Sequence, residues 1–435
     1  MKHFKNQIGW ALTTGALAPM SVLAHHPTKP SGKFAAPVTL PLTWAESTLY
    51  RPGLWMLDVA VGTPPQIQTL TFDTDFADIE IHSASDGNFT EACKTQIPSF
   101  CSTYNVSAST SFKSLGKGTY HFDSELFGIP EDGDYSTEVL HLGGVRIKNQ
   151  TFGYTTSSRE PYGNFGLSPP NNEIGVITNT FPQYPTYLES LVQQGIYENA
   201  CFSVWLDPEY PYEGFEAIPD GEVTFGGIDT GKFKGELVTF PVSGKVNGSS
   251  MAAFWDLSLT SITHGDSKTN LAAEPADCVI SMGDGQLYLP DDVYHNLATS
   301  IPGAFLNESI GFYEVPCDAK NDPNNTWTVG FTSPKSPAHP KGQHISIDIP
   351  VQGVIWPMSA IFGPTADPNT CTIAAQGPYL GSACILGWTM TKFGYWVFDL
   401  YNGEISFAPP AAKGEKPSHI IPLPDRGVTS LNFRY

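Results

Sequence analysis

Short apolar runs broken by glycine, proline, asparagine or aspartate recur along this sequence, and they restrict the fold more than any other feature. Such runs occupy residues 54–62, 138–144, 222–227, 254–262, 344–349 and 395–400. Several alternate apolar and polar residues, which is the period of a β-strand. The 435 residues include 41 glycines and 37 prolines, with only 15% charged residues. This composition predicts a turn-rich, all-β protein of two or three lobes, with a few short helices.

Two segments carry helix signals. Residues 186–195 follow a proline, place three aliphatic side chains on one face and end at Gly195. Residues 291–300 follow Pro290 and begin with two acids, which favour the first turn of a helix. We therefore expect a short helix at each position.

The charge balance and the N-terminus indicate where the protein works. A formal net charge of −20 disfavours nucleic acid and anionic membranes as partners. Residues 1–24 have the basic start, apolar stretch and small final residues of a secretory signal peptide, and no other segment predicts a membrane anchor. We expect a secreted, extracellular monomer. Six Asn-x-Ser/Thr sequons predict glycosylation at Asn88, Asn105, Asn149, Asn247, Asn307 and Asn324.

The chain repeats one pattern. Residues 69–81 and 277–289 each read as an apolar strand, a polar turn and a second apolar strand, which predicts two similar lobes. A Gly/Ser-rich stretch at 240–252 separates them. The expected organisation is a signal peptide (1–24), an N-terminal segment (25–50), a first lobe (51–245), a second lobe (246–412) and a C-terminal extension (413–435).

Six segments in order resemble the pepsin-like aspartic peptidases. They are VGTPPQ (61–66), FDT (72–74), FGLSP (165–169), residues 189–206, GEVTFGGID (221–229), and ILG (385–387) with residues 395–409. The resemblance implies a bilobal β fold with a central cleft. It also implies two aspartates, one from each lobe, that share a proton, each within Asp-Thr/Ser-Gly.

The first turn departs from this pattern at one position. Asp73 stands at the aspartate position and Thr74 at the hydroxyl position, but Asp75 replaces the glycine. Asp75 is either a drifted residue or a replacement second carboxylate. We favour drift, because neighbouring turn residues rarely aim two carboxyls at one water.

The second turn departs further. The aspartate position falls on Ser281 and the hydroxyl position on Met282, while Gly283 is retained. No base for a Ser281 nucleophile is recognisable, so we interpret Ser281 as a small polar filler. Asp284 is expected to point elsewhere as a turn residue.

The flap and several framework positions also differ. Phe127 stands near the flap tyrosine position, Glu80 at a tryptophan position and Trp388 at an aspartate position. The resemblance implies bridges Cys93–Cys101 and Cys317–Cys371. The remaining cysteines, Cys201, Cys278 and Cys384, are predicted to be buried thiols, with a bridge among them left open. Without CxxC or histidine clusters, we expect no metal and no cofactor.

These departures predict a secreted homologue without ordinary peptidase activity, which binds a peptide, glycan or small-molecule ligand in its cleft. Three alternatives remain. One is an acid endopeptidase with an unusual pair, Asp73 with Asp75 or with Asp284. Another is single-carboxylate acid/base chemistry on a small molecule by Asp73. The last is a structural wall or matrix protein.

Overall fold

The computed structural model describes most of the chain between residues 33 and 431. The described ranges are 33–45, 53–96, 100–124, 129–158, 162–208, 220–243, 254–322, 325–333, 342–359, 369–378 and 384–431. The predicted signal peptide, Phe127, Asn247, Asn324 and the predicted boundary between residues 245 and 246 lie outside them, as does the side chain of Asn88.

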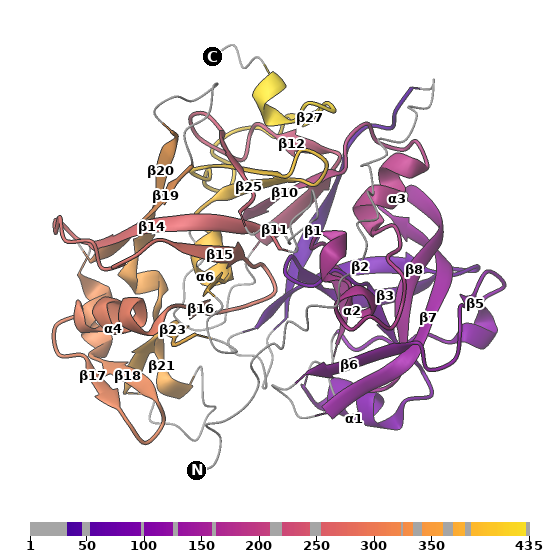
Figure 1. The fold of residues 1–435 in the computed structure, drawn as a ribbon, viewed down its shortest axis with the longest axis horizontal. Helices are drawn as coiled ribbons and strands as arrows, with labels where there is room; N and C mark the ends of the chain where they lie inside the picture. The colour runs from indigo at the N-terminus through magenta and orange to yellow at the C-terminus, as the bar shows by residue number, and fades with distance from the viewer. Residues whose placement is uncertain are drawn as a thin grey trace, which may run out of the picture.

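Strands dominate the molecule, which is bilobal and all-β as the sequence predicts (Figure 1). The largest sheet has fourteen strands and includes both early and late parts of the chain. Its order is β13 (Val238–Pro241), β26 (Glu404–Ala408), β25 (Tyr395–Asp399), β10 (Cys201–Leu206), β11 (Asp220–Phe225), β1 (Val38–Ala45), β2 (Leu54–Val61), β7 (Ile129–Leu142), β8 (Val145–Ser157) and β4 (Glu80–His82), with β3 (Gln66–Asp73), β5 (Lys113–Ser114), β6 (Tyr120–Ser124) and β9 (Gly163–Gly166) beside this path.

The later part of the chain builds a second lobe, drawn in orange in Figure 1. Its seven-stranded sheet has the order β20 (His344–Pro350), β19 (Thr326–Thr332), β14 (Asp256–His264), β15 (Ala276–Ile280), β24 (Cys384–Leu386), β16 (Leu287–Tyr288) and β23 (Ala375–Gln376). The smaller sheets are β17 (Phe305–Asn307), β18 (Phe312–Val315), β22 (Cys371–Ile373) and β21 (Ile355–Pro357), and the pair β12 (Gly227–Asp229) and β27 (Ile420–Pro422).

The helices are short. They are α1 (Gly87–Gln96), α2 (Ile174–Ile177), α3 (Tyr187–Gln193), α4 (Asp291–Thr299) and α6 (Trp388–Thr391), with 3-10 turns η1 (Val106–Ala108), η2 (Pro170–Asn172), η3 (Cys317–Asn321), η4 (Val351–Gly353) and η5 (Val428–Ser430). Both predicted helices are confirmed as α3 and α4. A capping box between Thr186 and Glu189 explains why α3 begins where it does.

Three disulfides cross-link the described chain. Cys93–Cys101 and Cys317–Cys371 are confirmed. The prediction of buried thiols is wrong for Cys278 and Cys384, which form a third bridge. The parallel pairing of β15 with β24 places these two residues opposite each other, with their Cα atoms 4.5 Å apart. Cys201 is a free, buried thiol, as expected.

Candidate active site

The first turn leaves the end of β3. β3 runs parallel to β9, with Asp73 opposite Gly166. The Leu167 amide donates to the Asp73 carbonyl at 2.8 Å, and the Ser168 amide donates to the Phe76 carbonyl at 3.0 Å. The FGLSP segment therefore supports the backbone of the turn from both ends.

The second turn leaves the end of β15 in a similar way. β15 runs parallel to β24, and the Ser281 amide donates to the Leu386 carbonyl at 3.0 Å. The Trp388 amide donates to the Asp284 carbonyl at 2.8 Å. The repeat that the sequence showed thus corresponds to two strand-to-turn units, each supported by a parallel strand.

The hydroxyl of Thr74 joins the first turn to the backbone of the second. Thr74 Oγ1 donates to the Ile280 carbonyl at 2.8 Å and accepts from the Met282 amide at 3.0 Å. Met282 has no hydroxyl to return this interaction, and its fully buried side chain accepts a contact from Thr391 Oγ1 at 3.2 Å. The hydrogen bonds of Thr74 therefore have no counterpart at residue 282.

The retained glycine brings the second turn against Asp73. A Cβ atom on Gly283 would lie 2.6 Å from Asp73 Oδ1 and 2.7 Å from its Cγ. Real Cβ atoms do not approach other atoms this closely, so this contact requires glycine. Gly283 thus allows the second turn to approach Asp73 closely.

Three carboxyl groups meet between the turns. The Asp75 amide donates to Asp73 Oδ1 at 3.0 Å, and Ser281 Oγ donates to Asp75 Oδ1 at 3.0 Å. Ser281 Oγ also accepts from the Asp284 amide at 2.9 Å. The carboxyls of Asp73 and Asp284 each form a hydrogen bond with that of Asp75.

This geometry corrects two expectations. Asp284 does not point away, because its carboxyl belongs to the same cluster as that of Asp75. Asp75 extends from the first turn to the fully buried Ser281, where the resemblance places the second aspartate. A small serine side chain leaves room there for a carboxyl that arrives from the opposite turn.

Burial and mutual repulsion shift the acidity of the cluster. Burial raises the pKa of Asp73 and of Asp284 well above the usual range, and the negative charge of Asp75 raises both further. All three residues retain partial exposure, so water reaches them. The site therefore holds two carboxyls of raised pKa beside a third, an arrangement suited to acid/base chemistry at one water.

The comparisons with known proteins agree with this architecture. The model of the family described as eukaryotic aspartyl protease matches residues 55–410. This chain belongs to that family. "Probable aspartic-type endopeptidase opsB" of Aspergillus fumigatus is 29% identical over 367 residues, which are 82% of this chain and 68% of the relative. Rhizopuspepsin-1 of Rhizopus niveus is 28% identical over 358 residues (81% and 78%), and human gastricsin is 23% identical over 371 residues (83% and 83%).

This eukaryotic aspartyl protease homologue has a hairpin at the expected flap. β6 pairs with β7 from Tyr120–Gly133 to Ser124–Ile129, and the tip that contains Phe127 lies outside the described residues. Phe122 packs edge-on against Phe76 with ring centroids 5.6 Å apart. The flap strand thus contacts the residue that follows Asp75.

Sequence reasoning missed one carboxyl that supports the site. Asp78 is fully buried and accepts hydrogen bonds from Tyr135 (2.8 Å), Tyr184 (2.7 Å) and the Ile174 amide (2.7 Å). Burial raises its pKa. A third acid five residues after Asp73 was the available signal, but its partners lie as far as 106 residues away.

Trp388 takes a structural role in this family member. It replaces an acid that the resemblance expects, and its ring packs edge-on against Trp44 at 4.8 Å and stacks on Trp356 at 5.9 Å. This aromatic contact joins the early strand β1 to the end of β24. Trp388 therefore adds packing rather than a fourth carboxyl.

Proposed function

We propose that this chain is an acid endopeptidase whose two working carboxyls, Asp73 and Asp75, both come from the first turn. One observation carries the proposal: Ser281 Oγ donates to the Asp75 carboxyl at 3.0 Å, at the position where the family resemblance places the second aspartate. The relatives described as aspartic endopeptidases support the reaction class.

The roles follow from the positions of the two carboxyls and from the raised pKa of Asp73. Asp73, whose pKa is raised, is the acid that protonates the peptide carbonyl. Asp75 is the carboxylate that takes a proton from water as the oxygen attacks the carbonyl carbon. A proton then passes to the amide nitrogen as the C–N bond breaks. Asp284, hydrogen-bonded to Asp75, orients that carboxyl.

Three proteins test the proposal: wild type, Asp75→Gly, and Asp75→Gly combined with Ser281→Asp. We expect wild type to cleave a denatured protein between about pH 3 and 6. Asp75→Gly should lose activity by about a thousandfold or more, because one carboxyl cannot act as both acid and base. The double variant should regain activity, since it restores one aspartate to each turn. An exposed-site control, Asp132→Asn, should cleave as wild type does.

A second candidate is a cleft-binding protein without peptidase activity, which holds a peptide, glycan or small molecule. The observation in its favour is that Ser281 is fully buried and its hydroxyl is occupied by Asp75 and the Asp284 amide. The same assay separates the candidates. An inactive wild type with an active double variant would support the binding protein and reject the rearranged pair.

We propose further that the protein acts outside the cell as a glycosylated monomer. The leader sequence and the three disulfides support secretion. Asn105 and Asn149 are exposed and Asn307 is partly exposed, so a glycan has access to each. Within the described part of the chain, every helix falls short of the length and apolarity needed to traverse a bilayer. Mass spectrometry of culture supernatant before and after deglycosylation tests this proposal.

A further inference from the structure

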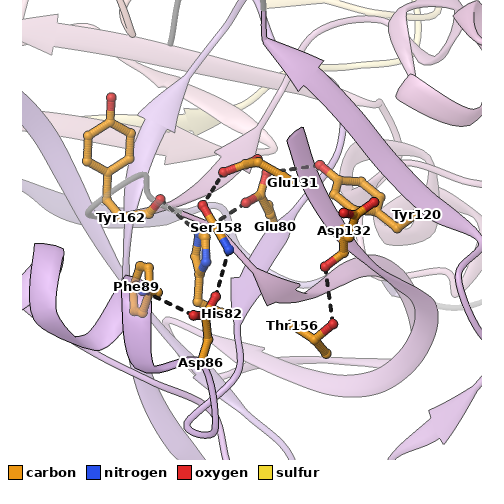
Figure 2. A network of polar contacts seen from close by, with 10 residues as sticks. All are labelled: Glu80, His82, Asp86, Phe89, Tyr120, Glu131, Asp132, Thr156, Ser158 and Tyr162. Atoms are coloured by element: carbon orange, nitrogen blue, oxygen red, sulfur yellow. Dashed lines mark hydrogen bonds and ion pairs between the residues drawn. The ribbon is translucent and has the colours of Figure 1, made fainter. Parts of the chain in front are cut away.

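A second polar cluster, made of other residues than the carboxyls of the two turns, lies inside the first lobe (Figure 2). Glu80 and His82 come from β4, and Glu131 comes from β7 near the flap hairpin. Their exposed fractions are 1%, 2% and 3%. One ligand atom from each residue lies within 4.8 Å of the others. Three metal-binding side chain groups thus converge in the interior.

The imidazole nitrogen faces oxygen atoms. His82 Nε2 lies 3.0 Å from Glu80 Oε1 and 3.0 Å from the Tyr162 carbonyl oxygen. The His82 ring stacks on Phe89 with a centroid distance of 3.9 Å and an interplanar angle of 6°. This stacking fixes the ring plane and therefore the direction of Nε2.

Outer contacts fix the two carboxyls in the same way. The Tyr120 hydroxyl donates to Glu80 Oε2 at 2.9 Å, and the Ser158 hydroxyl donates to Glu131 Oε1. The Ser158 amide donates a hydrogen bond to Asp86 Oδ2 at 2.7 Å. Figure 2 shows these contacts surrounding the Glu80–His82–Glu131 group. Partners that orient ligands from outside are a regular feature of protein metal sites.

We propose that Glu80, His82 and Glu131 form a buried structural site for a zinc ion. Zinc binds imidazole nitrogen and carboxylate oxygen at about 2.0–2.2 Å, so two of its ligand atoms lie roughly 3–3.6 Å apart. The 3.0 Å separation of His82 Nε2 and Glu80 Oε1 fits a small movement around such an ion. Calcium and magnesium prefer oxygen alone, so the imidazole favours zinc over both.

The position of the cluster suggests what the ion does. β4 follows the first turn, and β7 is one strand of the flap hairpin. An ion held by Glu80, His82 and Glu131 would link these two strands through their side chains. Because the cluster is buried, zinc would enter as the protein folds, and its binding would add to the stability of the fold.

The competing occupant is a proton. Burial and the charge of Glu80 raise the pKa of Glu131. A proton shared by these two carboxyls would relieve their repulsion, as a zinc ion would. The two states differ in composition, which makes them separable by elemental analysis. Because metal binding requires deprotonated ligands, the measurement is made at about pH 7.5.

The test measures zinc in the full chain, expressed in zinc-supplemented medium and dialysed against EDTA. We expect about one zinc per chain in wild type and roughly a tenth of that or less in Glu131→Gln, which keeps the shape of the side chain. His121→Gln is the matched control, since His121 forms an exposed pair with Asp132 at 2.7 Å. It should retain zinc. Asp75→Gly should also retain zinc, which excludes the cluster between the turns as the source.

X-ray absorption at the zinc edge gives a readout that does not depend on any variant. We expect one nitrogen ligand with oxygen ligands and no sulfur. Metal-free wild type would overturn the proposal and leave the proton as the occupant. Zinc that persists in Glu131→Gln, or a spectrum with sulfur ligands, would place the ion elsewhere and overturn it as well.

Discussion

The two turns of this protein share a backbone plan and differ in their side chains. Each follows a strand paired in parallel with a later one, β3 with β9 and β15 with β24. The first turn supplies two acids and the hydroxyl of Thr74. The second supplies Ser281, Gly283 and Asp284, which receive or support the groups of the first. A site built by two similar halves can therefore become asymmetric while its backbone stays the same.

Removal of the disulfide beside the second turn should have the largest effect on stability of the changes that test this difference. Cys278 and Cys384 link β15 to β24 across 106 residues, whereas hydrogen bonds alone join the described residues of β3 and β9. Replacing both cysteines with alanine should lower the free energy of unfolding by about 4–5 kcal/mol, because a long loop regains its freedom. Removing Cys93–Cys101, which closes 8 residues, should cost about 2–3 kcal/mol. Urea titration measures both, and equal costs would contradict the loop argument.

The close approach of the turns is tested next. Gly283→Ala places a Cβ 2.6 Å from Asp73 Oδ1, so the Asp73 carboxyl or the turn must move. We expect a loss of about 2–3 kcal/mol in unfolding free energy, together with a fall in any peptidase activity. Gly87→Ala is the control, because a Cβ there meets nothing within 4 Å. A fully stable and active Gly283→Ala variant would show that the turns are not in contact.

Loss of the Thr74 hydroxyl should have a smaller effect. Thr74→Val removes a partner from both the Ile280 carbonyl and the Met282 amide. This change should cost about 1–2 kcal/mol in thermal or urea unfolding. Thr69→Val removes an exposed hydroxyl contact with Asp58 and should cost roughly 0.5 kcal/mol or less. If both substitutions cost the same, Thr74 contributes no special connection between the turns.

The pH dependence of stability is the most gradual effect. The pKa values of Asp73 and Asp284 are raised in the folded state, so folding favours their protonated forms. Their contribution is complete below about pH 4, where the unfolded carboxyls are also protonated, and is lost as pH rises through the folded pKa values. We expect the melting temperature to fall from pH 4 to pH 7. Asp284→Asn should flatten this slope, and an unchanged slope would show that Asp284 does not titrate with the cluster.

Much of the fold could be predicted because its determinants are local. Alternating runs gave β2, β11, β14, β20 and β25, and proline with first-turn acids gave α4. The order of family motifs also pointed to Ser281, at the expected position of the second aspartate, and the Ser281 hydroxyl lies in the cluster of carboxyls. These signals depend on period and spacing, which the sequence displays directly.

The contacts between side chains far apart in sequence could not be predicted, because they depend on pairing between distant strands. Asp75 was interpreted as drift, since only the contact between the turns shows that its carboxyl meets Ser281 across 206 residues. Cys278 and Cys384 were predicted to be thiols for the same reason, because only the pairing of their strands shows that they meet. Glu131 joins Glu80 and His82 only because β7 and β4 both pair with β8.

The position of β10 between an early and a late strand affects how the protein folds during synthesis. β10 has β11 on one side and β25 on the other, so its second neighbour does not exist until residues 395–399 have been translated. A nascent or truncated chain would present β10 as a bare sheet edge, which invites pairing with other chains. Completion of the central sheet is therefore a late event, and a chain shortened at its C-terminus should aggregate or be degraded.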